Sequence, residues 1–331
     1  MKHIAKTALA TALTLAFAAP SFAVAPITVY GKVNVSVEST DHRGSDFDSK
    51  IDISSNASRF GAKGGVALTD TLNAVYVVEW AVNVSDQDSS SRGSNNITAR
   101  NQYVGLEGNF GELLVGRNDT ILKQSQGKVD LFNDLRGDVQ TLFRGEVRSG
   151  ETVTYKTPSF SGFQAGATWI NETAGNEDKN GEAVDAFSLG AWYGDDSLKK
   201  TPVYAGLAVD SEVSGYDVVR ASVQGKLAGF TLGGMYQMQE KVAANSEDKT
   251  GYLLSAAYSL GDFKPMVQYQ DMEDLGDSIS VGAEYKLGKP TKLYAFYTGR
   301  SFENQIPSTV KDSTISDDKE SFIGVGIDHR F

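Results

Sequence analysis

The chain has 331 residues, of which 31 are basic and 42 acidic, giving a net charge of −11, and it contains no cysteine. This acidity argues against a nucleic-acid-binding protein, because affinity for phosphates comes mostly from clustered cations. The lack of cysteine excludes disulfides and thiolate metal sites, so stability must come from the fold alone. Outside residues 1–23 there is no run of about 18 apolar residues, which excludes helical membrane spans.

Residues 1–23 are predicted to be a secretory signal peptide. Two lysines precede an apolar run over residues 8–19, and a small residue follows at Ala23, where we expect cleavage. Cleavage after Ala25 also satisfies the small-residue rule but would leave Pro26 as the N-terminus. A membrane anchor is the alternative, but the apolar run is too short to span a bilayer. Removing these residues leaves 29 basic against 42 acidic residues, a net charge of −13.

Residues 24–331 are predicted to form one all-β domain, because no composition shift or Pro-rich linker divides them. Apolar and aromatic residues alternate with polar or small ones, which is the period of a strand with one apolar face. The apolar faces include Val29, Gly31, Val33, Val35 and Val37, then Leu72, Ala74, Tyr76, Val78, Trp80 and Val82, then Phe163, Ala165, Ala167 and Trp169, and then Leu254, Ala256, Tyr258 and Leu260.

The connections between these runs alternate between long acidic loops and short turns. Short turns are expected near residues 109–111, 228–229, 261–262 and 288–290. Long loops are expected at residues 39–49, 85–97, 118–145, 171–182, 210–216, 241–249, 271–277 and 303–319. About sixteen strands lie between them, each of roughly the 9–11 residues that cross a bilayer at a tilt.

We therefore predict a transmembrane antiparallel β-barrel of 16 strands. A soluble sandwich or solenoid is the alternative, but aromatic residues near the strand ends of the apolar faces are typical of a membrane girdle. The final strand, residues 321–331, should pair with a first strand that begins near Ile27, since a closed barrel leaves no free edge. Its lipid-facing residues would be Ile323, Val325, Ile327, His329 and Phe331.

The longest loop, residues 118–145, is expected to fold inward and constrict the lumen. A barrel of sixteen strands encloses an aqueous lumen rather than a filled core. A loop of this length without a function is unusual. Its stretch ILKQSQGKVDLFNDLRGDV carries both apolar residues and acids.

Five stretches of the chain resemble the general porins of the Gram-negative outer membrane. In order, they are TVYGK, SRFGAKG, ARNQYVGLEGNFGELLVGR, VTYKTPSFSGF and the terminal HRF. The resemblance covers essentially all of residues 24–331. It implies a homotrimeric, sixteen-stranded diffusion channel that contacts outer-membrane lipid and lipopolysaccharide and passes small hydrophilic solutes and ions. We expect no nucleic-acid partner, no cofactor and no metal site.

The resemblance also implies which residues line the constriction. The inward lysine and the wall arginines of the family correspond to Lys32, Arg59, Arg100 and Arg148, and the facing loop acids to Asp130 and Asp134, with Asp138 at the loop's return. Alternation independently puts all four cations on the polar face, Arg100 because it opposes Tyr103. The loop reads LFNDLRGD in place of the family's Pro-Glu-Phe-Gly-Gly-Asp and adds the cation Arg136.

Cations that face carboxylates across a lumen create a transverse field, which orients water and dipolar solutes without binding them tightly. Any single one of these arginines could instead be a solvated surface charge. Four cations that alternation places on the inward face of their strands favour a pore lining. The sequence leaves the ion preference open, because the net charge is negative while the proposed constriction holds more cations than acids.

Three other functions fit the sequence less well. A Ser–His hydrolase is disfavoured, because His3 leaves with the signal peptide, His42 is expected in a loop and His329 on the lipid face. A substrate-specific channel would carry a track of inward aromatics, whereas the inward aromatic residues are scattered. A structural or adhesive barrel would be smaller and plugged, or would carry a further periplasmic domain. We therefore predict a diffusion channel and no enzyme.

Overall fold

The computed structural model describes residues 27–43, 50–85, 96–243, 246–303 and 319–331. The predicted signal peptide and its cleavage site lie outside these residues, as do parts of the long loops expected at 39–49, 85–97, 241–249 and 303–319. Among the described residues, no helix is both long enough and apolar enough to cross a membrane.

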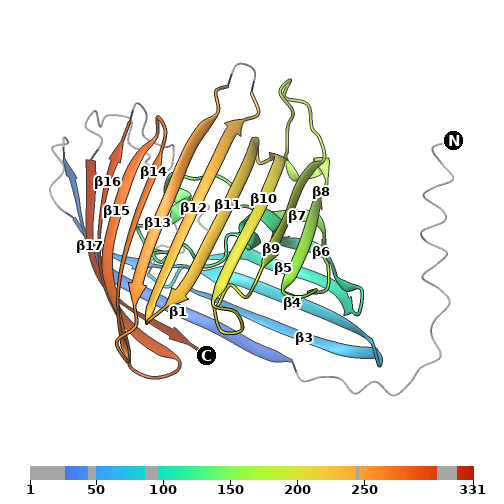
Figure 1. Cartoon of the computed structure of the whole chain (residues 1–331), viewed down its shortest axis with the longest axis horizontal. Coiled ribbons are helices and arrows are strands. Elements are labelled where there is room, and N and C mark those ends of the chain that lie inside the picture. Colours follow the sequence, from blue (N-terminus) through green and yellow to red (C-terminus); the bar gives the residue numbers. More distant parts are fainter. Residues whose placement is uncertain (1–26, 44–49, 86–95, 244–245, 304–318) are drawn as a thin grey trace.

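The described residues form seventeen strands in one antiparallel sheet that closes on itself (Figure 1). The strands are β1 (Thr28–Arg43), β2 (Lys50–Ser55), β3 (Arg59–Thr69), β4 (Leu72–Val82), β5 (Ile97–Gly108), β6 (Gly111–Asp119), β7 (Arg148–Lys156), β8 (Phe163–Ile170), β9 (Ala186–Tyr193), β10 (Val203–Val213), β11 (Tyr216–Leu227), β12 (Phe230–Lys241), β13 (Lys249–Tyr258), β14 (Phe263–Met272), β15 (Gly276–Lys286), β16 (Thr291–Phe302) and β17 (Lys319–Arg330). Three short helices complete the elements: α2 (Ile121–Ser125), η1 (Val139–Thr141) and η2 (Glu172–Ala174).

The strands β2 and β3 act as one strand with a break at residues 56–58. Both pair with β1: β2 pairs with its second half and β3 with its first five residues. The barrel therefore has sixteen strands around its circumference, as predicted. The pairing of β1 with β17, which runs from Lys32 opposite Arg330 to Arg43 opposite Lys319, closes it.

Along each strand, successive side chains face the lipid and the lumen in turn. On β1, Val29, Val33 and Val37 are exposed on the outside, while Lys32 and Glu38 are buried on the inside. Aromatic pairs join neighbouring strands of the outer face, such as Phe163 and Tyr193 with ring centroids 4.9 Å apart. An apolar outer belt over a polar interior is the pattern that the bilayer imposes on a barrel, because lipid cannot hydrogen-bond.

Two predicted long loops are tight turns. Strand β10 continues to Val213 and β11 begins at Tyr216, while β14 continues to Met272 and β15 begins at Gly276. Strand β1 likewise extends through His42, which was expected in a loop. The prediction was wrong because these segments have the acidic composition of loops. Beyond the hydrocarbon layer, main-chain hydrogen bonds alone can continue a strand whatever its side chains.

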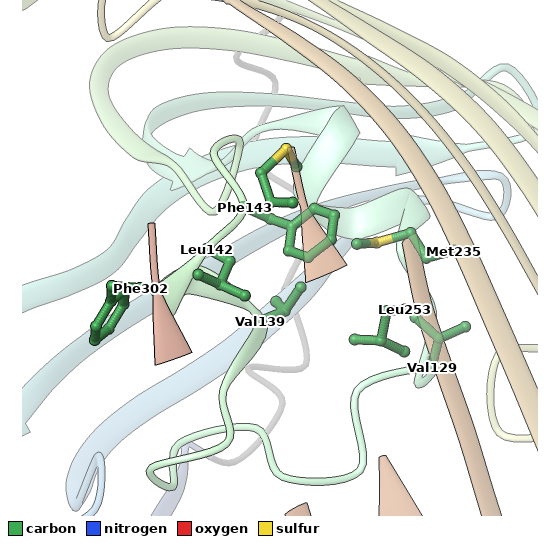
Figure 2. Close-up of a cluster of buried hydrophobic side chains, with 8 residues drawn as sticks. Val129, Val139, Leu142, Phe143, Met235, Leu253 and Phe302 are labelled. Carbon is green, nitrogen blue, oxygen red and sulfur yellow. The ribbon is translucent and has the colours of Figure 1, made fainter. Parts of the chain in front are cut away.

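Residues 120–147, here called the lumen loop, lie against the inner wall of the barrel. Four buried loop residues, Val129, Val139, Leu142 and Phe143, form an apolar cluster with Met235, Leu253, Met272 and Phe302 of strands β12, β13, β14 and β16 (Figure 2). A second cluster surrounds the fully buried ring of Phe132 and includes Ala257, Met266, Tyr294, Phe296 and Phe322. These clusters hold much of the aliphatic packing that a soluble protein would keep in its core.

Inward-facing glutamines satisfy the backbone of the lumen loop. Gln224, Gln268 and Gln239 each accept a hydrogen bond at 2.8 Å through Oε1, from the backbone N–H groups of Lys128, Leu131 and Arg144 respectively. Buried backbone groups must be paired, and an irregular loop can pair only some of its own. The glutamines on the inner face of β11, β12 and β14 therefore fix the position of the loop.

Candidate functional site

Glu79 on β4 is the centre of one ion-pair cluster on the inner face of the barrel. Its Oε1 lies 2.6 Å from Arg100 Nε, and its Oε2 lies 3.7 Å from Arg59 Nε. The Tyr30 hydroxyl donates to the same carboxylate at 3.1 Å. One acid thus holds two arginines from neighbouring strands.

Asp119, at the end of β6, is the centre of a second cluster. Its Oδ1 lies 3.0 Å from Arg148 Nη2 and 3.3 Å from Lys123 Nζ. Asn101 donates to its Oδ2 at 3.3 Å and accepts from Arg148 Nε, which links Asp119 to the strand that carries Arg100. Together the two clusters, here called the charged wall, hold four cations around two carboxylates.

Arg100 reaches the charged wall for a different reason from the predicted one. Val77 lies two residues before Glu79 on β4, so both side chains face the lumen. Tyr103 pairs with Val77 and therefore also faces the lumen, on the same side as Arg100 and not on the opposite side. A register shift between Val78 and Trp80 inserts an extra residue on β5 at this point. Because a β-bulge adds one residue, every residue beyond it faces the side opposite to the one that simple alternation predicts.

Two ion pairs connect the lumen loop to the first strand. Lys32 Nζ lies 2.8 Å from Asp134 Oδ2, and Arg136 Nε lies 2.6 Å from Glu38 Oε2. Lys32 is 5% exposed, so the loop covers it. Of the predicted cations, Arg59, Arg100 and Arg148 lie together on the charged wall, while Lys32 meets the loop instead.

Asp130 and Asp138 brace the lumen loop from within. Asp130 accepts hydrogen bonds at 2.9 Å from the backbone N–H groups of Phe132 and Val139. Asp138 caps η1 through Gln140 N–H at 2.9 Å and accepts from Asp134 N–H at 2.7 Å. Burial, with a smaller contribution from the nearby Asp138 charge, raises the pKa of Asp130 well above its usual value. Burial also raises the pKa of Asp138, to about 6.

Arg220 on β11 anchors the returning arm of the lumen loop and was not predicted. Its fully buried guanidinium donates to Glu146 Oε1 at 2.6 Å, to Gln126 Oε1 at 2.7 Å, to the Arg144 carbonyl at 2.7 Å and to Gln237 Oε1 at 2.7 Å. The signal in the sequence is an arginine between the apolar Val219 and Ala221, whose alternation turns it inward.

The end of β17 lies where it was predicted. Ile327 is 43% exposed and His329 is also exposed on the outer face, where His329 Nδ1 lies 2.8 Å from Thr291 Oγ1. The backbones of Phe331 and Gly31 exchange two hydrogen bonds of 3.0 and 3.1 Å. Phe331 is exposed and ends the seam that closes the barrel.

This arrangement can attract, orient and pass charged solutes, since fixed charges of both signs line one side of the lumen. Among the residues that the structure describes, no group of three or more His, Cys, Asp or Glu side chains is suited to hold a metal ion.

A closed barrel with a lipid-compatible exterior and a charged inner wall defines the class of outer-membrane channel. The chain belongs to the Gram-negative porins, whose family model matches residues 8–305. It is 28% identical over 334 residues to the major outer membrane protein P.IB of Neisseria sicca, spanning 85% of this chain and 90% of that protein.

Two solved structures share the fold. The anion-selective porin from Comamonas acidovorans has a TM-score of 0.73 at 20% identity, covering 93% of this chain and all of that one. The trimer form of OmpT from Vibrio cholerae has a TM-score of 0.63 at 17% identity, covering 93% of this chain and 99% of that one. The predicted family and fold are thereby confirmed. The protein is an outer-membrane channel for the diffusion of small solutes.

Proposed function

We propose that solutes pass between the charged wall, which includes Lys123 at the start of the lumen loop, and the rest of that loop, and that the passage weakly prefers anions. The observation that carries this proposal is the composition of the wall: Arg59, Arg100, Arg148 and Lys123 surround only Glu79 and Asp119. The loop acids do not offset this excess, since Lys32 neutralises Asp134 while Asp130 and Asp138 are buried within the loop. The anion selectivity in the description of the Comamonas acidovorans porin also supports the proposal.

In this proposal the predicted site residues have four roles. Arg59, Arg100 and Arg148 line the passage and attract anions. Lys32 and Asp134 hold the tip of the lumen loop so that the loop narrows the lumen. Asp130 and Asp138 keep the loop compact, and Ile327, His329 and Phe331 serve the lipid face and the closing seam.

The test is single-channel recording in a planar bilayer, with the reversal potential measured under a potassium chloride gradient. We expect the reversal potential to have the same sign as the equilibrium potential of chloride. It should shift toward the equilibrium potential of potassium when Arg59, Arg100 and Arg148 are each changed to Gln. A matched control is Lys289→Gln, which removes an exposed cation from the turn between β15 and β16. A potassium-preferring wild-type channel would contradict the proposal.

The remaining features belong to the same proposal. We propose a homotrimer, supported by the trimer form described for OmpT of Vibrio cholerae. Outer-membrane lipid and lipopolysaccharide would surround the trimer. Residues 1–23 would be removed after Ala23, leaving residues 24–331 as one domain without enzymatic activity. Chemical cross-linking of the mature protein in detergent tests the trimer, and N-terminal sequencing tests the cleavage site.

A further inference from the structure

A cavity of about 550 Å³ lies between the lumen loop and the wall formed by β10, β11 and β16. Val213 and Ser214, at the turn between β10 and β11, form part of its lining and place it at the barrel end opposite the C-terminus. In outer-membrane barrels the turn-rich end that holds the termini faces the periplasm. The cavity, here called the vestibule cavity, therefore opens toward the outside of the cell and is distinct from the charged wall.

Arg144 supplies an unpaired cation to this cavity. Its side chain is exposed, and within the described part of the chain it makes no ion pair. Its guanidinium lies over the ring of Tyr216, 5.2 Å from the ring centroid. The stacked ring orients the guanidinium and leaves its edge free for an anion.

Arg300 lines the same cavity and adds a positive charge to it. Its side chain is 12% exposed, and its buried Nε has no hydrogen-bond partner among the described residues. One of its terminal nitrogens donates to the Arg136 carbonyl, and the other is 3.6 Å from Glu320. Because protein encloses this N–H, Arg300 would act on a ligand in the cavity through its positive charge and not through a hydrogen bond from Nε.

The carboxylates that line the cavity are already engaged. Both oxygens of Asp138 accept backbone N–H groups of the lumen loop, and Glu146 pairs with the buried Arg220. Arg136, the third arginine of the lining, pairs with Glu38. Of the lining's charged groups, Arg144 and Arg300 are thus the ones with capacity for a ligand.

The uncharged part of the lining mixes apolar, aromatic and neutral polar residues. Leu135, Phe143, Val147 and Val213 line the cavity beside Tyr216, and Gln140, Thr141 and Ser214 add neutral polar groups. Pockets that hold small molecules have volumes of roughly 300–1,000 Å³, with an apolar lining and a few placed polar groups.

We propose that the vestibule cavity binds small aromatic carboxylates on their way into the channel. The carboxylate would meet the exposed guanidinium of Arg144, with the positive charge of Arg300 nearby, since guanidinium groups match carboxylates in geometry and charge. The aromatic ring of the solute would lie against Leu135 and Tyr216. This inference deepens the proposed passage for anions by naming a class of solute that the channel retains and concentrates at its outer end.

Benzoate is the probe, added on the outer side of single wild-type channels in a planar bilayer. We expect brief, concentration-dependent interruptions of the current. Arg144→Gln should raise the half-blocking concentration about tenfold, the size of effect that one charged hydrogen bond gives, and Arg300→Gln, which removes only a nearby charge, should raise it less. The control Lys289→Gln should leave that concentration unchanged, and cyclohexanecarboxylate, with the same charge and no aromatic ring, should block more weakly.

Calorimetric titration of benzoate into the detergent-solubilised protein tests binding independently of conduction. Wild-type channels that conduct without interruption, together with no heat of binding, would overturn the cavity proposal and leave the channel intact. Equal block in wild type and in Arg144→Gln, or by benzoate and cyclohexanecarboxylate, would also overturn it. A folded barrel that binds benzoate but does not conduct would overturn the proposed passage and support the cavity. Arg144 is exposed, so its variant should fold even if the Arg300 variant does not.

Discussion

Lys32 on β1 and Asp134 in the lumen loop form an ion pair of 2.8 Å, although 102 residues separate them in the chain. The loop residue has a φ of 68°, in the left-handed region. The local turn of the loop therefore aims this carboxylate at the first strand. The pair ties the loop to the side of the barrel where β1 meets β17.

Asp134→Asn should loosen the tip of the lumen loop. Asparagine tolerates the left-handed backbone, so the substitution removes the charge without adding strain. It leaves Lys32 buried beside a neutral amide, which should weaken docking of the tip by about 3 kcal/mol, at the low end for breaking a buried pair. Hydrogen exchange of residues 130–140 should then be about a hundredfold faster. Asn133→Ser, at the exposed neighbouring position, is the control; unchanged exchange in Asp134→Asn would show that the pair is not needed.

Glu79→Gln should increase the preference for anions. The substitution keeps an acceptor for Tyr30 but leaves Arg59 and Arg100 without their shared acid. Removing one negative charge about 6 Å from the path in water favours chloride and disfavours potassium by roughly 0.7 kcal/mol each, so the chloride-to-potassium permeability ratio should rise about tenfold. Reversal potentials in a salt gradient measure it. A shift of the opposite sign would mean that passing ions do not meet this cluster.

Arg220→Met should release the returning arm of the lumen loop. The loss of four hydrogen bonds leaves the Glu146 carboxylate without its cation and the Gln126 side-chain oxygen without this donor, which should cost about 3–5 kcal/mol of docking free energy. Trypsin should then cleave the folded barrel after Lys123, Lys128 or Arg144. Arg330→Gln, which changes a side chain that is 64% exposed, should leave the loop resistant. Resistance in both variants would show that the apolar clusters hold the loop without Arg220.

Docking of the lumen loop should weaken as the pH rises from 4 to 6. The pKa of Asp138 is raised from 3.8 to about 6 by burial, so the docked loop favours the protonated acid. The stabilisation is complete below pH 3.8 and is lost as the pH rises through about 6, a change of about 3 kcal/mol. Hydrogen exchange of the loop, corrected for intrinsic rates, should show this fall in wild type and a flatter profile in Asp138→Asn. Parallel profiles would contradict the assignment to Asp138.

Gly31→Ala should disturb the closing seam. A Cβ at this position would lie 2.3 Å from Phe331 Cζ and 2.9 Å from the Arg59 carbonyl oxygen, so both the ring and the neighbouring strand must move. Overpacking of this kind costs about 1–3 kcal/mol and should lower both the melting temperature and the refolding yield. Gly225→Ala is the control, because its nearest neighbouring atom would be 3.8 Å away. Equal losses of melting temperature and refolding yield in the two variants would show that crowding at the closing seam is not the cause.

Alternation predicted the barrel wall well, because lipid on one side and water on the other impose a period of two on every regular strand. Lys32 faces in and Val33 faces out, as expected. The same rule failed at Arg100 and Tyr103, where a bulge adds a residue and no compositional signal marks it. It also failed beyond the bilayer, where both faces of a strand can be polar, as at the turn between β14 and β15.

The lumen loop was less predictable than the wall. Its length and its place in the chain indicated an inward loop, but which acid meets which cation depends on the local backbone. The left-handed conformation of Asp134 turns its carboxylate to Lys32, while Asp130 and Asp138 turn into the loop. The partners Glu38 and Arg136 are 98 residues apart, and no short-range pattern relates them.

The apolar clusters beneath the lumen loop also constrain the order of folding. Val129 and Phe143 pack with residues as distant along the chain as Phe302, so the loop cannot dock before the strands β12 to β16 are in register. A partly assembled barrel with its loop undocked would expose apolar side chains on both surfaces, to lipid outside and to water inside. Such an intermediate would be prone to aggregation, which couples loop docking and strand closure into one cooperative step.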